Sequence, residues 1–127
     1  MVIAIVDDDS GVLKALGRLL SDCGYRIEPY ASAEAFLAAT STSQAKCLVV
    51  DIGLTGISGL EMVSKLSSDG FRFPVIFISA FIDDNYRKQA LELGCVEYLH
   101  KPFAPELLIA AVEKAIGRGA DYASPEP

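Results

Sequence analysis

Five residues that can do chemistry stand at or just beyond the ends of short apolar runs: Asp7, Asp8, Asp51, Ser79 and Lys101. Carboxylates that lie close together repel one another and raise each other's pKa unless a cation lies among them. Mg²⁺ is the cation we expect, because it takes oxygen ligands and combines a few carboxylates with water and phosphate. A lysine ammonium and a serine hydroxyl on the opposite side could bind the oxygens of a phosphoryl group. Together the five side chains predict a site for a dianion beside a metal ion.

Such a site requires elements that bring distant residues together. Continuous apolar runs, in place of alternating ones, predict strands that are covered on both faces. Segments with apolar residues at helical spacing separate these runs. The expected strands cover residues 2–6, 26–30, 47–50, 75–78 and 96–99. The expected helices cover residues 12–23, 33–37, 60–66, 83–93 and 105–116.

Polar and glycine residues mark the ends of several expected helices. Asp9 or Ser10 is suited to the N-cap of the first helix, and Gly24 is suited to its C-terminal end. Ser58 and Glu61 have the spacing of a capping box, in which each side chain bonds the other residue's backbone N–H. These signals support the boundaries given above.

Strand and helix alternate five times, which predicts an α/β fold with a parallel sheet and helices on both faces. Right-handed crossovers leave few arrangements, and we expect the five-stranded, flavodoxin-like order 2-1-3-4-5. Ligands of such sheets lie outside the carboxyl ends of the strands, so the candidate side chains are expected at one edge. We expect one domain over residues 1–117 and a flexible tail or linker over residues 118–127.

The composition excludes several classes of protein. The chain has 127 residues, of which 51% are hydrophobic and 22% charged, and this suits one compact domain. A net charge of −6 argues against an electrostatic grip on nucleic acid. The apolar runs are too short to span a membrane, and the acids at 7–9 interrupt any signal-peptide pattern. We therefore expect a soluble, cytoplasmic protein without a membrane partner.

The cysteines and the single histidine carry little chemistry. Cys23, Cys47 and Cys95 are odd in number and lack a C-x-x-C pair or histidines at metal spacing, which argues against disulfides and a zinc site. We expect the three cysteines to be small buried hydrophobes. His100 has no neighbouring nucleophile and is expected on the surface.

Four segments together resemble the signature of the receiver domains of two-component response regulators, over roughly residues 2–116. These segments are Ile5-Val6-Asp7-Asp8-Asp9, Val50-Asp51, Ile78-Ser79-Ala80 and Lys101-Pro102-Phe103. The loop at 51–59 and the segment at 98–103 resemble the receivers that are usually joined to LuxR-type DNA-binding domains. No such output domain is recognisable in this sequence, so contact with DNA is expected only through one.

The resemblance implies a phosphoacceptor that a sensor histidine kinase phosphorylates on Asp51. Asp8 and Asp51 would ligate Mg²⁺ directly, together with the carbonyl of Gly53, and Asp7 would act through a bound water. Lys101 would pair with the phosphoryl oxygens. Such a domain is not an enzyme in the usual sense, because it catalyses only its own phosphorylation and dephosphorylation.

The resemblance also implies a switch. Ser79 would turn towards the phosphoryl oxygens on activation, and Tyr98 stands at the position of the family's switch aromatic. Tyr98 could equally be a half-buried strand aromatic. Lys101 and Pro102 would be joined by a cis peptide bond. The resemblance is also compatible with homodimerisation on phosphorylation.

One departure and three alternatives accompany this interpretation. The family commonly has proline four residues after the phosphorylated aspartate, where this chain has Thr55, which predicts a more mobile loop. A receiver-like binding module that signals without phosphate is therefore an alternative. A phosphatase of the haloacid-dehalogenase type would use Asp7 as nucleophile and Asp9 as acid/base, but it would leave Asp51 idle. An FMN-binding flavodoxin is disfavoured, because the acids after the first strand repel phosphate.

Three further aromatic residues have two readings. Phe81, Tyr86 and Phe103 could be ordinary core or rim residues, which we favour, or they could line an output surface near the last two helices and the last strand.

Overall fold

The computed structural model describes the backbone of residues 1–123 and the side chains of residues 1–117. Strands and helices alternate along the chain, as the sequence predicts. The strands are β1 (Val2–Val6), β2 (Arg26–Tyr30), β3 (Ala45–Asp51), β4 (Val75–Ser79) and β5 (Glu97–His100). The helices are α1 (Ser10–Asp22), α2 (Ala33–Ala39), α3 (Gly59–Ser68), α4 (Asp84–Glu92) and α5 (Pro105–Ala123).

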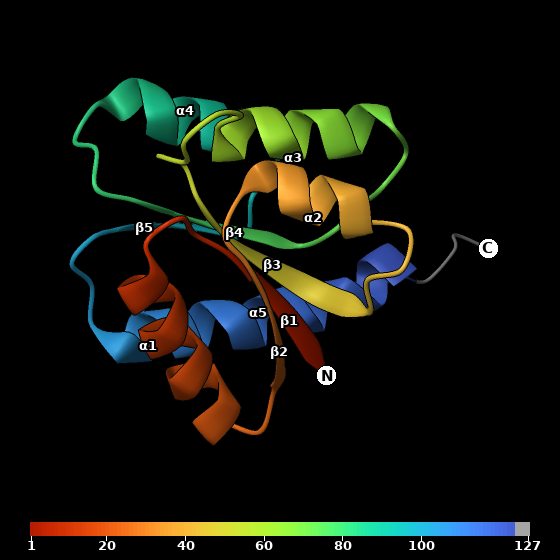
Figure 1. Ribbon diagram of the computed structural model, residues 1–127, viewed down its shortest axis with the longest axis vertical. Coiled ribbons are helices and arrows are strands. Elements are labelled where there is room, and N and C mark those ends of the chain that lie inside the picture. The colour runs from red at the N-terminus through yellow and green to blue at the C-terminus, as the bar shows by residue number, and fades with distance from the viewer. Residues whose placement is uncertain (124–127) are drawn as a thin grey trace.

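The five strands form one parallel sheet in the order β2-β1-β3-β4-β5, which confirms the predicted topology. Helices α1 and α5 cover one face of the sheet, and α2, α3 and α4 cover the other (Figure 1). The central strands β1, β3 and β4 are almost entirely buried, because they are covered on both faces. Pro29 lies in β2, an edge strand, where a missing backbone donor is tolerated.

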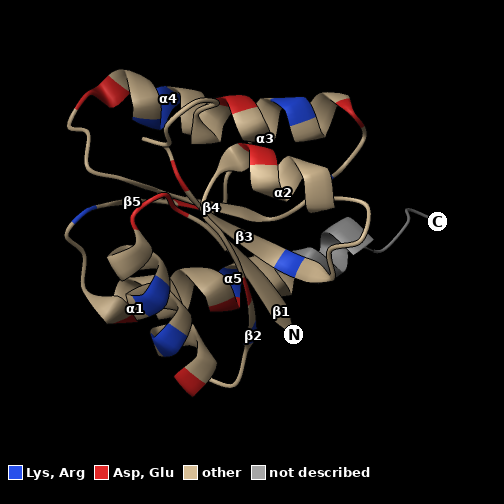
Figure 2. Cartoon of the chain, viewed as in Figure 1, with Lys and Arg blue, Asp and Glu red and all other residues tan. Residues whose placement is uncertain are grey.

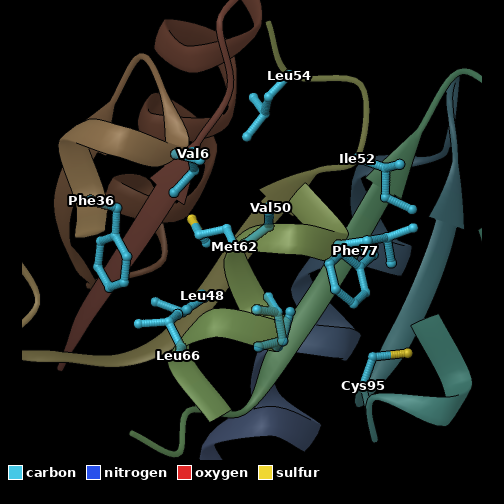
Figure 3. Packing of buried hydrophobic residues seen from close by; sticks show 14 of the residues in the cluster. Val6, Phe36, Leu48, Val50, Ile52, Leu54, Met62, Leu66, Phe77 and Cys95 are labelled. Carbon is cyan, nitrogen blue, oxygen red and sulfur yellow. The ribbon is translucent and has the colours of Figure 1, made fainter. Parts of the chain in front are cut away.

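Two apolar clusters, one on each face, hold the helices against the sheet. On the face of α2 and α3, buried residues of the helices pack over the middle strands (Figure 3). Phe36 of α2 and Met62 of α3 are fully buried there, in the same cluster as Phe77 of β4. On the other face, Leu20 of α1 and Leu108 of α5 are fully buried. A rigid two-sided core of this kind fixes where each strand ends.

The predicted helix caps are present at α1 and α3. The Asp9 carboxylate accepts the backbone N–H groups of Gly11 and Val12, at 2.9 Å and 3.2 Å, which makes Asp9 the N-cap of α1. Ser58 and Glu61 form both bonds of the capping box at α3.

The predicted boundaries differ from the observed ones by up to two residues, except at the end of α5, where the difference is larger. Strand β3 begins at Ala45, two residues before the expected start. Helix α5 runs to Ala123 and does not end at Ile116. Gly117 and Gly119 lie within it, because a helical glycine costs only about 1 kcal/mol relative to alanine and a longer helix can absorb that cost. The last part of the expected tail, residues 124–127, lies outside the described residues.

The cysteine prediction holds at two positions and fails at the third. Cys47 and Cys95 are buried, and burial raises the pKa of the Cys47 thiol to about 12. Cys23 is exposed, because it is the C-cap of α1 and lies where the chain leaves the helix. His100 is exposed, as predicted. Among the described residues, no helix combines the length and apolar character that crossing a bilayer requires.

Candidate functional site

The candidate residues converge where neighbouring parallel strands end. Asp7 follows β1 directly, and Asp51 is the last residue of β3, which pairs with β1 in the register Val6 to Val50. Ser79 is the last residue of β4. Figure 2 shows acidic residues at the ends of β1 and β3, and a basic residue in the loop between β5 and α5. The parallel sheet thus brings residues far apart in sequence to one edge.

Lys101 joins the two buried aspartates. Its Nζ lies 3.2 Å from Asp7 Oδ2 and 3.3 Å from Asp51 Oδ2. The backbone N–H of Lys101 donates to the Ser79 carbonyl at 2.7 Å, which ties the loop after β5 to the end of β4. The peptide bond between Lys101 and Pro102 is cis, as the family resemblance implied. One ammonium therefore serves two carboxylates.

Burial and neighbouring charges shift the pKa values of both Asp7 and Lys101. The Asp7 side chain is fully buried, and this burial raises its pKa, with the negative charge of Asp51 acting in the same direction. Its partners are the Asp9 N–H at 2.9 Å and Lys101. Burial alone would lower the pKa of the Lys101 ammonium, but Asp51 and Asp7 together outweigh it and raise that pKa. The cluster keeps an excess of negative charge.

Asp8 lies at the exposed side of the cluster. Its Oδ2 accepts the Thr55 backbone N–H at 3.0 Å and the Thr55 hydroxyl at 2.6 Å. These two hydrogen bonds lower the pKa of the Asp8 carboxyl. Sequence reasoning missed this contact, since it treated Thr55 only as a missing proline.

Three carboxylates are close enough to share a cation. One oxygen each from Asp7, Asp8 and Asp51 lies within 4.8 Å of the others. All the donors are hard oxygens, and a single lysine faces the two buried carboxylates. This donor set fits Mg²⁺, which binds few carboxylates and completes its shell with water and phosphate. The cation expected from the sequence is therefore compatible with the geometry.

The loop after β3 approaches the site through its backbone. The Gly53 N–H donates to Asp51 Oδ1 at 3.1 Å. A Cβ atom at Gly53 would lie 3.1 Å from the ring of Phe81, so this aromatic residue covers the loop beside Asp51. At Gly59, a Cβ atom would collide with the backbone carbonyl of Asp51 and with Val50. Glycine at these places allows the loop and α3 to pack closely against the end of β3.

Ser79 and Tyr98 contact the loop after β4 and helix α4, respectively. The Ser79 side chain is fully buried, and its hydroxyl accepts the Phe81 N–H at 2.9 Å. Tyr98 is half-buried in β5, with the Arg87 guanidinium 5.6 Å from its ring centre. The ring of Phe81, itself 43% exposed, stacks on Tyr86 at 4.9 Å. Ser79 thus lies where β4 meets the loop that carries Phe81.

The structure brings the charged candidate residues together. Asp7, Asp51 and Lys101 are in direct contact, and Asp8 lies beside them. Ser79 stands at the same sheet edge, but its hydroxyl is engaged with its own loop. Asp9, the acid/base of the phosphatase alternative, is exposed and occupied as a helix cap.

Comparison with known proteins agrees with this arrangement. The family model for the response regulator receiver domain matches residues 3–113. The chain is 35% identical over 122 residues to the transcriptional regulatory protein FixJ of Azorhizobium caulinodans, covering 96% of the chain and 58% of FixJ. It is 37% identical over 115 residues to the response regulator protein TmoT of Ectopseudomonas mendocina, covering 91% of the chain and 52% of TmoT. The chain thus spans little more than half the length of these relatives.

A solved structure confirms the fold independently. The CheY-like receiver domain protein of Methanospirillum hungatei JF-1 superposes with a TM-score of 0.87 at 24% identity, covering 95% of this chain and 97% of that one. At this level of identity the match concerns the arrangement of the elements.

Proposed function

The chain belongs to the response regulator receiver family, and from this premise we propose that it is a phosphoacceptor that carries a phosphoryl group on Asp51. The observation that supports this most is the setting of the Asp51 carboxylate. One of its oxygens lies on the Lys101 ammonium at 3.3 Å and the other on the Gly53 N–H at 3.1 Å. The side chain is thereby held in one orientation at the end of a buried strand.

The proposed step is transfer from a phosphohistidine of a sensor kinase. A carboxylate oxygen of Asp51 attacks phosphorus, an O–P bond forms as the P–N bond breaks, and the imidazole nitrogen keeps the bonding electron pair. Positioning and neutralisation of charge matter more for phosphoryl transfer than nucleophilic strength. Lys101 neutralises charge on the phosphoryl oxygens, and the backbone bond from Gly53 orients the attacking group.

Mg²⁺ would be held by Asp8 and Asp51, with the Gly53 carbonyl, while Asp7 would act through water. The ion would supply positive charge beside the transferred group. The three carboxylates within 4.8 Å of one another, against one ammonium, support this part of the proposal. A cation held there would relieve the repulsion between the buried carboxylates of Asp7 and Asp51.

Ser79 and Tyr98 form the proposed switch. The Ser79 hydroxyl now accepts the Phe81 N–H; on activation it would give up this bond and turn to donate its O–H to a phosphoryl oxygen. This exchange moves the loop between β4 and α4, and Tyr98 next to α4 would report the change at the surface. A Tyr98 ring whose NMR signals stay unchanged on phosphorylation would contradict this switch.

The partners follow from the same proposal. The phosphoryl donor is a sensor histidine kinase, with the cytoplasm as the site of action. Homodimerisation on phosphorylation is a further proposal, and DNA would be contacted only through a separate output domain. The chain also removes its own phosphoryl group by hydrolysis, and it has no other enzymatic activity.

Intact mass spectrometry tests the phosphoacceptor proposal. The protein is incubated with phosphoramidate in Mg²⁺ or in EDTA, and the Asp51→Asn variant is treated in parallel. We expect one phosphoryl group on the wild-type protein in Mg²⁺, and none in EDTA or in Asp51→Asn. Glu28→Gln, which changes a carboxylate far from the cluster in sequence, is the control and is expected to be phosphorylated like wild type. An unmodified wild-type protein would contradict the proposal and favour a phosphate-independent module.

A further inference from the structure

Thr55 uses both of its donors on the same carboxylate oxygen. Its N–H and hydroxyl reach Asp8 Oδ2 at 3.0 Å and 2.6 Å, across 47 positions of sequence. Proline, common at this place in the family, has no N–H and no hydroxyl and could supply neither bond. We propose that Thr55 is a positioning residue that orients Asp8 towards the metal ion. This inference rests on the proposed Mg²⁺-dependent function.

Asp8 is the member of the cluster that most needs such support. Asp7 is fully buried and held by Asp9 and Lys101, and Asp51 is held by Gly53 and Lys101. Asp8 is exposed and, among the described residues, forms no ion pair with Lys101. An exposed side chain loses rotamer freedom when it binds a cation, and this loss weakens binding. Thr55 imposes the order before the ion arrives.

The bonding pattern leaves Asp8 able to ligate. A carboxylate has about four acceptor positions on its two oxygens. Both Thr55 donors lie on Oδ2, so Oδ1 keeps its acceptor positions for the ion. The contact therefore strengthens the site and does not compete for it.

Thr55 is itself on an anchored loop. The Ile57 N–H donates to Glu34 Oε2 of α2 at 3.3 Å. The Gly59 N–H donates to the Ile52 carbonyl at 3.1 Å, where α3 begins. Gly56, with φ +80°, makes the turn between Thr55 and Ile57 in a conformation that favours glycine. The loop that carries Thr55 is thus tied both to α2 and to Asp8.

Titration with MgCl₂ alone tests the inference without any phosphoryl donor. The ¹⁵N-labelled protein is titrated, and the shifts of backbone amides around Asp51 give the Mg²⁺ dissociation constant. Thr55→Val keeps the shape but removes the hydroxyl, and we expect about tenfold weaker Mg²⁺ binding, the low end for residues that support a metal ligand. Thr55→Ser keeps the hydroxyl and is expected to bind within twofold of wild type. Thr42→Val, which removes an exposed hydroxyl in another loop, is the matched control.

The outcomes separate the two claims. Weaker binding in Thr55→Val with recovery in Thr55→Ser, at an unchanged metal-free unfolding midpoint, supports the positioning role. Wild-type or tighter affinity in Thr55→Val overturns it and leaves the phosphoacceptor proposal standing. Absence of Mg²⁺ binding by the wild-type protein itself would overturn both.

Discussion

Two sites in this molecule hold buried or partly buried carboxylates, and their negative charges are compensated to different extents. In the Glu28 cluster, the carboxylate of β2 accepts three hydrogen bonds from neutral donors. The Ser43 hydroxyl lies 2.6 Å from Oε1, the Tyr30 hydroxyl 3.0 Å from Oε1, and the Gln44 N–H 3.2 Å from Oε2. Burial alone would raise the pKa of Glu28, but these donors outweigh burial and lower it. The single negative charge of Glu28 is therefore fully compensated by hydrogen bonds.

The aspartate cluster, made of Asp7, Asp51 and Lys101, has too few partners. Two carboxylates share one ammonium, and the pKa of the buried Asp7 is raised where that of Glu28 is lowered. Hydrogen bonds compensate the charge of Glu28, whereas the aspartate cluster keeps more negative than positive charge. The difference supports the proposal that a cation and a phosphoryl group bind at the aspartate cluster and not at the Glu28 cluster.

Removal of the shared ammonium is the harshest test of this contrast. Lys101→Met leaves two buried carboxylates unpaired, and we expect it to lower the free energy of unfolding by about 3 kcal/mol in metal-free buffer. Ser43→Ala leaves Glu28 with two donors and is expected to cost about 1 kcal/mol. Urea unfolding measures both. Equal losses of unfolding free energy in the two variants would contradict the claim that the aspartate cluster lacks positive charge relative to the Glu28 cluster.

Neutralising a carboxylate should change stability in opposite directions at the two clusters. Asp7→Asn removes the repulsion on Asp51 and keeps an acceptor for the Asp9 N–H, so we expect about 1 kcal/mol more stability without metal. Glu28→Gln loses charge-assisted bonds and is expected to lose about 1 kcal/mol. The same urea experiment applies. A destabilised Asp7→Asn would break the comparison.

The smallest effect is a pH dependence at Glu28. Its pKa is lowered from 4.5 in the folded protein, so its stabilisation is fully present above that pH and is lost as the pH falls through the lowered folded value. The gap in unfolding free energy between wild type and Glu28→Gln should therefore be constant from pH 7 to about 5 and close below about 4.5. A gap that grows on acidification would contradict the hydrogen-bond account.

The charged part of the site could be predicted from the sequence because it depends on topology. A parallel sheet brings the carboxyl ends of β1 and β3 to one edge, so residues after those strands must meet there. Asp7 and Asp51 were found in this way, and Lys101 with them. The fold itself followed from continuous apolar runs and helical spacing, which report burial on both faces.

The contacts of individual loops could not be predicted. The bond between Thr55 and Asp8, and the position of Phe81 over Gly53, depend on how two loops fold back in space. The spacing of apolar residues along the sequence does not indicate which loop residues contact one another. The end of α5 was missed for a different reason: glycine lowers helix stability without forbidding a helix, so Gly117 did not mark the boundary.

Identification of the phosphorylated residue tests the central claim most directly. The protein is treated with phosphoramidate in Mg²⁺ and reduced with borohydride, which converts an aspartyl phosphate to homoserine, and its peptides are then sequenced by mass spectrometry. The account predicts homoserine at position 51 alone, and none when EDTA replaces Mg²⁺. Homoserine at position 7, or a phosphorylated protein without homoserine at position 51, would contradict it.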